Sequence, residues 1–95
     1  MTNEIAKYIR KNFFNDDAYR EIHVQNDIER DECLQFLEDS GILWLSGDRP
    51  TKWRPASHDF YITVGNNVLT WDNTSLTSNF VEWADLTKII SLFET

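Results

Sequence analysis

The amino-acid sequence predicts one globular α+β domain over residues 1–95, with a small, mainly antiparallel sheet covered by two or three helices. Three segments space their apolar residues as amphipathic helices do, and four shorter runs are rich in β-branched and aromatic residues. Two of these runs flank Gly65-Asn66-Asn67, which predicts a β-hairpin at about residues 60–71. An apolar content of 41% is too high for a disordered chain, so we expect a packed core.

The first helix is expected over residues 3–14. At about 100° per residue, one side of this helix carries Ile5, Tyr8, Ile9 and Phe13. The opposite side carries Lys7, Arg10 and Lys11. The first helix should therefore present a basic outer face.

The second helix is expected over residues 27–40, between an Asn26 or Asp27 cap and Gly41 in a left-handed conformation. Its apolar arc holds Cys33, Leu34, Phe36 and Leu37. The facing arc holds Asp31, Glu32, Gln35, Glu38 and Asp39, without a basic residue. Because carboxylates four residues apart on a helix repel, this acidic arc gives up some helix stability.

Residues 83–93 place apolar side chains at i, i+3, i+4 and i+7, which favours a helix over a strand. Strands are expected at residues 19–24, 42–45, 60–64 and 68–71, and residues 72–79 form a polar loop. The expected shared core comprises Ile22, Val24, Leu34, Leu37, Leu43, Ile62, Val64, Leu69 and Ile90.

The net charge of −7 is concentrated in residues 12–42, where nine acids face only Arg20 and Arg30. Such a block indicates partner binding, since charge distribution governs association more than fold. The candidate partner-binding residues are Asp27, Asp31, Glu32, Glu38 and Asp39. They would meet a protein with a basic surface, imitating the phosphate track of DNA. The alternative is a solvated helix face that keeps the protein soluble. Direct nucleic-acid binding is not expected, because it requires clustered Lys and Arg.

A second candidate is the loop at residues 46–58, which carries Arg49, Lys52, Trp53 and Arg54 together with two prolines, Pro50 and Pro55. Tryptophan and arginine are enriched in interface hot spots, and basic side chains beside an aromatic ring suit an anion or a nucleotide phosphate. The alternative is that Trp53 covers the edge of the core while its basic neighbours balance the acidic helix.

No catalytic residues, metal site or cofactor are predicted. His23, His58 and Cys33 are scattered singly, unlike the close ligand sets of zinc, and Cys33 on an apolar arc fits a small core residue. No nucleotide-binding glycine motif occurs, so we expect that the protein is not an enzyme. A single cysteine, no leader pattern and no membrane-length apolar run favour a soluble cytoplasmic protein.

Residues 36–50 run from a helix ending at a glycine, through a strand with Trp44, to Ser46-Gly47-Asp48-Arg49-Pro50. With the strand pair that follows, this pattern over residues 31–71 resembles small uncharacterised accessory proteins of tailed bacteriophages. The resemblance implies a host-takeover or counter-defence role in the host cytoplasm, with anti-CRISPR activity as one case. It supplies no site residues.

The favoured function is therefore a non-enzymatic accessory protein whose acidic helix face inhibits a host nucleic-acid-binding protein. One alternative is a small-ligand sponge that holds a signalling nucleotide with the Arg49–Arg54 loop. The other is a structural or assembly protein, in which the basic face of one copy pairs with the acidic face of another as a homodimer.

Overall fold

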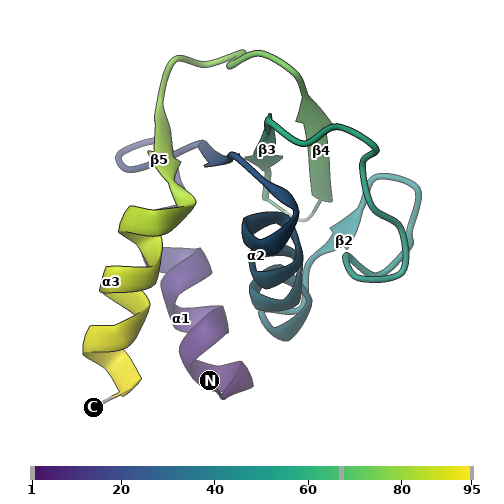
Figure 1. The fold of residues 1–95 in the computed structure, drawn as a ribbon. Helices are drawn as coiled ribbons and strands as arrows, with labels where there is room; N and C mark the ends of the chain where they lie inside the picture. The colour runs from purple at the N-terminus through teal and green to yellow at the C-terminus, as the bar shows by residue number, and fades with distance from the viewer. Residues whose placement is uncertain (1, 67, 95) are drawn as a thin grey trace.

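The computed structural model describes residues 2–66 and 68–94, which form three helices and five strands (Figure 1). In chain order these are α1 (Asn3–Phe13), β1 (Glu21–Val24), α2 (Asp27–Asp39), β2 (Leu43–Trp44), β3 (Phe60–Val64), β4 (Val68–Asp72), β5 (Phe80–Glu82) and α3 (Trp83–Glu94). In these described parts of the chain, no helix has the length and apolar character needed to cross a membrane.

The strands form one five-stranded sheet in the order β2-β4-β3-β1-β5, which confirms the predicted α+β class. The central pairs β1–β3 and β3–β4 are antiparallel, whereas the edge pairs β2–β4 and β1–β5 are parallel. The sheet is therefore mixed: its two central pairs are antiparallel, in line with the expected mainly antiparallel sheet, and its two edge pairs are parallel. Strand β5 was not predicted, because a three-residue run is too short to show an alternating pattern.

Capping residues mark the starts of α1 and α2, and a glycine marks the end of α2. Thr2 caps α1 by accepting a hydrogen bond from the Ile5 amide at 3.2 Å, and Asn26 caps α2 by accepting one from the Glu29 amide at 2.9 Å. Gly41 follows α2 with a φ of +85°, a conformation that favours glycine. Arg10 of α1 is half-buried, and its Nε donates to the Ser40 carbonyl at 3.3 Å. The basic face of α1 is thus partly used to join the end of α2.

The hairpin between β3 and β4 is confirmed, with Val64 opposite Leu69 and Ile62 opposite Trp71. The Gly65 amide closes the turn by donating to the Val68 carbonyl at 3.0 Å. Gly65 does not adopt a positive φ, but a Cβ there would lie 3.1 Å from the Val68 carbonyl oxygen. A side chain at position 65 would therefore crowd the Val68 carbonyl oxygen, which explains the glycine at this position. Asn67, the third residue of the predicted turn, lies outside the described residues.

The three helices gather on one side of the sheet (Figure 1), and the core lies between them. Along β3, Phe60, Ile62 and Val64 are buried, while the alternate positions Tyr61 and Thr63 are half-buried on the other face. All but one of the nine predicted core residues are buried.

Leu43 is the exception, and its prediction as a core residue was wrong, because it is 41% exposed. A strand was expected at residues 42–45, and β2 is a two-residue strand at the edge of the sheet. Ile42 and Trp44 point inward and are buried, so Leu43 and Leu45 point outward by strand alternation. The helices cover only one face of the sheet (Figure 1), and a continuous run of apolar residues does not reveal which of them point toward that face.

Candidate functional site

The five predicted partner-binding residues lie along α2, and the structure separates them into two groups. Asp31, Glu32 and Asp39 line a groove of about 550 Å³ between α2 and α3. Asp27 and Glu38 do not line the groove, because both are bonded to the long loop between β2 and β3.

The groove combines acidic walls with an apolar floor. The buried side chains of Phe36, Trp83 and Ile90 line it together with the carboxylates. Trp83 Nε1 donates to Glu32 Oε1 at 3.2 Å, which fixes one carboxylate beside an indole ring. The residues described along the groove include Gln35, Thr87, Ser91 and Glu94 but no Lys, Arg or His. We call this site the acidic groove.

Basic residues that do not belong to the acidic arc of α2 lie close to two carboxylates of this helix. Asp31 Oδ1 lies 3.1 Å from Arg30 Nε and 3.5 Å from Arg54 Nε, and Asp27 Oδ1 lies 2.6 Å from His58 Nδ1. The hydrogen bond from His58 is the main reason that the pKa of Asp27 is lowered. For Glu32 and Asp39 the described residues provide only uncharged partners, the Trp83 indole and the Gln35 amide. Glu32 and Asp39 therefore keep a carboxylate charge that no basic residue among those described is paired with.

Glu38 joins α2 to the loop. It accepts hydrogen bonds from the Thr51 hydroxyl at 2.6 Å and from the Thr51 amide at 3.2 Å. These bonds, the hydroxyl first, and the charge of Arg49 hold the pKa of Glu38 below its usual range. Glu38 thus stabilises the loop conformation, and its carboxylate is already used within the domain.

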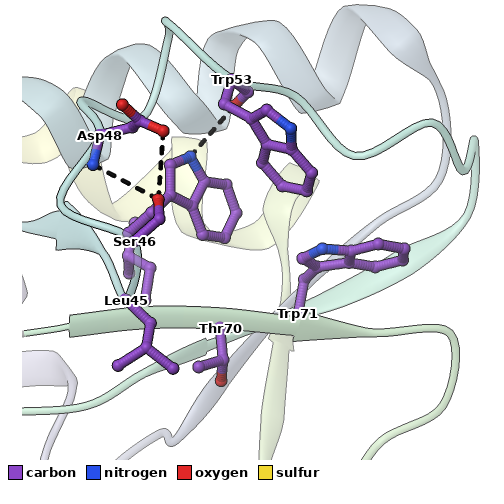
Figure 2. Close-up of a pocket in the computed structure, with 8 residues that line it drawn as sticks. Leu45, Ser46, Asp48, Trp53, Thr70 and Trp71 are labelled. Atoms are coloured by element: carbon purple, nitrogen blue, oxygen red, sulfur yellow. Dashed lines mark hydrogen bonds between the residues drawn. The ribbon is translucent and has the colours of Figure 1, made fainter.

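The four candidate residues of the loop are all exposed, but the structure does not gather them into one site. Arg54 pairs with Asp31 of α2, and the charge of Arg49 helps to lower the pKa of Glu38. Trp53, 45% exposed, is the one member of this group that lines a pocket of about 330 Å³ (Figure 2). The pocket residues are Trp44, Leu45, Ser46, Asp48, Trp53, Leu69, Thr70 and Trp71.

A third cluster, which the sequence did not reveal, lies on the sheet face away from the helices. His23 Nε2 lies 2.6 Å from Asp59 Oδ1, and His23 Nδ1 lies 2.6 Å from Glu82 Oε2. The imidazole is stacked on Tyr61 with ring centroids 4.4 Å apart. Ionised carboxylates only accept hydrogen bonds, so both ring nitrogens can donate to them when His23 is protonated, and the site favours the charged form. Burial lowers the pKa of His23, but the hydrogen bonds to Asp59 and Glu82 outweigh it, and the net shift is upward.

This shift gives the domain a pH-dependent stability. The folded state binds the His23 proton more tightly than the unfolded chain does. The stabilisation is therefore complete below about pH 6.5 and is lost as the pH rises through the folded pKa. We expect the free energy of unfolding in urea to fall between about pH 6 and about pH 8, and His23→Gln to flatten this fall. His58→Gln, at a 76% exposed side chain, is the matched control. An equal slope in the parent and His23→Gln would contradict the role of this cluster.

The remaining chemistry-bearing residue is Cys33, which is fully buried on the inner face of α2. Burial, with a smaller contribution from the charge of Glu29, raises the pKa of the Cys33 thiol. A buried thiol of this kind is a poor nucleophile. Within residues 2–66 and 68–94, no three His, Cys, Asp or Glu side chains are arranged to hold a metal ion.

Comparisons of the chain with protein-family models, with curated proteins and with solved structures give no match. The site therefore has to be interpreted from its own geometry.

Proposed function

We propose that this domain is a non-enzymatic binding protein whose acidic groove engages a basic segment on the surface of a nucleic-acid-binding protein. The acidic groove carries the proposal, because carboxylates line an apolar cleft that contains no basic residue among those described. The predicted acidic residues alone would fit a solvated surface equally well. Their position around Phe36 and Trp83 is what favours a binding role.

The chemistry of the groove suits arginine and lysine side chains. Their long apolar stems pack on hydrophobic surface while the charged heads stay at its edge. At the edge of this groove the heads would meet Glu32 and Asp39, and a guanidinium bonds a carboxylate through two parallel hydrogen bonds. A surface that normally holds nucleic-acid phosphates offers such side chains in number.

The resemblance to phage accessory proteins supports a host protein as the partner and inhibition of that protein as the outcome, with counter-defence as one case. The two alternatives receive less support from the geometry. Arg54 pairs with Asp31 of α2, and neither Arg49 nor Arg54 lines the Trp53 pocket, which weakens the nucleotide-sponge interpretation. A homodimer through Lys7 and Lys11 of α1 is distinguished from a host complex by the mass of the complex in solution.

The test is affinity capture from bacterial lysates with three forms of the domain. The groove variant carries Asp31→Asn, Glu32→Gln and Asp39→Asn, which removes three charges at nearly constant shape. Glu38 is left intact, because its hydrogen bonds to Thr51 stabilise the loop. The control variant carries Asp16→Asn, Asp17→Asn and Asp85→Asn, which removes the same charge from residues outside the groove.

We expect the parent and the control variant to recover the same basic protein, and the groove variant to lose it. Both variants should unfold within about 1 kcal/mol of the parent, since exposed charges contribute little to stability. Recovery of the same protein by the groove variant would contradict the proposal. A parent domain that captures no basic protein would contradict it as well.

A further inference from the structure

The Trp53 pocket has a geometry that the proposed function does not use. Trp44 and Trp53 meet at 87° with ring centroids 5.4 Å apart, and Trp53 and Trp71 meet at 43° with centroids 6.4 Å apart. Figure 2 shows the indole of Trp53 above that of Trp71, with Leu45 and Thr70 along the lower side. The pocket walls are therefore indole rings inclined to one another.

Inclined rings do not suit a flat ligand. A nucleobase held between two aromatic side chains needs them nearly parallel, whereas the ring planes here differ by 43° and 87°. A compact, rounded group can contact several inclined rings at once. The volume of about 330 Å³ leaves space for a short chain attached to such a group.

The charge of the pocket points to a cation. Asp48 is the one ionisable residue among those described as lining it, and its Oδ2 accepts a hydrogen bond from Ser46 Oγ at 3.2 Å. Arg49 and Arg54 of the same loop lie close to carboxylates of α2, which offsets their repulsion of a bound cation. Indole faces attract cations most strongly of the aromatic side chains.

The ligand of the pocket is not a peptide that adds a strand to the sheet, because the loop after β2 already bonds the outer edge of β2. The Trp44 amide donates to the Asp48 carbonyl at 2.9 Å, and the Gly47 amide donates to the Trp44 carbonyl at 2.8 Å. These bonds use the backbone groups of Trp44 that an added strand would need.

We propose that the Trp53 pocket binds a methylated ammonium group, held by the indoles of Trp53 and Trp71, with the buried Trp44 packed behind them, and by the carboxylate of Asp48. A methylated ammonium group occurs in two kinds of ligand: a free quaternary ammonium compound, or a methylated lysine in a protein. The proposal is independent of the acidic groove, with which the pocket shares no residue.

The experiment titrates the domain with tetramethylammonium, choline, a trimethyllysine peptide and the same peptide with unmodified lysine. Binding is measured from the indole N–H resonances in NMR spectra. A neutral compound in which a tert-butyl group replaces the trimethylammonium group has the same shape without the charge. We expect the cations to shift the pocket indoles but not that of Trp83, and the neutral compound to bind at least tenfold more weakly. Tighter binding of the trimethyllysine peptide than of choline would identify a protein ligand, and the reverse order would identify a small molecule.

Two variants test the assigned residues. Trp53→Leu should weaken binding about tenfold, as loss of a cation–π contact predicts, and it retains the Trp53 carbonyl that accepts from Trp44 Nε1. Asp48→Asn should weaken binding of the cations but not of the neutral compound, whereas Asp85→Asn outside the pocket should change neither. Equal affinity for the neutral and charged compounds would overturn the proposal. No shift with any cation at tens of millimolar would also overturn it.

Discussion

Replacing Leu37 by alanine is expected to lower the free energy of unfolding by about 2–5 kcal/mol, the range for a buried leucine that leaves a cavity. Leu37 is 0% exposed on the inner face of α2, in the core cluster formed with the sheet. The loss combines the transfer free energy of the removed carbon atoms with the cost of the cavity. Urea unfolding followed by tryptophan fluorescence measures it directly.

The control for this substitution lies on the same helix. Ile28 is 73% exposed near the start of α2, so Ile28→Ala removes a similar side chain without leaving a cavity. We expect its cost to stay within about 0.5 kcal/mol. If Leu37→Ala cost less than about 1 kcal/mol, the inward face of α2 would be wrongly assigned.

Glu21→Ala is expected to lower the free energy of unfolding by about 2–4 kcal/mol, because it leaves several polar groups without a partner. The Glu21 side chain is 0% exposed, on the sheet face away from the helices. Its carboxylate accepts hydrogen bonds from Ser75 Oγ, Thr77 Oγ1 and the amides of Leu76 and Thr77, at 2.6 to 3.2 Å. Glu21 thus holds the loop between β4 and β5, in which Ser78 adopts a φ of +59°.

Glu21→Gln separates charge from shape in the same position. Burial raises the pKa of Glu21, but the hydrogen bonds from the loop outweigh it, so the net shift is downward. The carboxylate therefore stabilises the fold at every pH above about 4.3, the ordinary glutamate value, and this is lost as the pH falls through the folded pKa. We expect Glu21→Gln to be less destabilising than Glu21→Ala and less sensitive to acid than the parent. Equal stability of the parent and Glu21→Ala at neutral pH would contradict the role of this carboxylate.

The elements that could be predicted from the sequence are those with strong local signals. The apolar arc of α2 from Cys33 to Leu37, its Asn26 cap and Gly41 all lie where the pattern places them. The hairpin could be predicted because two strands with alternating apolar residues flank a turn sequence. The exposure of Leu43 could not be predicted from the sequence, because it depends on which side of β2 the rest of the fold covers.

Long-range contacts explain what the sequence could not reveal about the sites. The acidic arc of α2 was predictable, but the acidic groove also needs Trp83 and Ile90 of α3, which are more than 40 residues away in the chain. The sequence placed Arg54 and the acids of α2 in separate candidate sites and offered a charge balance between them only as an alternative, whereas folding pairs Arg54 with Asp31. The hydrogen bonds to the buried carboxylate of Glu21 also join residues that are more than 50 positions apart in the chain.

The central claim is that the acidic groove attracts and holds a basic protein surface. Stopped-flow association of the captured partner, measured from about 0.01 M to about 0.15 M salt, tests it most directly, because the Debye length falls from ~30 Å to ~8 Å over this range. We predict that the on-rates of the parent and the control variant fall steeply and together. The groove variant should show a weaker salt dependence and a dissociation constant at least tenfold higher. Identical on-rates and dissociation constants for the groove variant and the control variant, at every salt concentration, would contradict the claim.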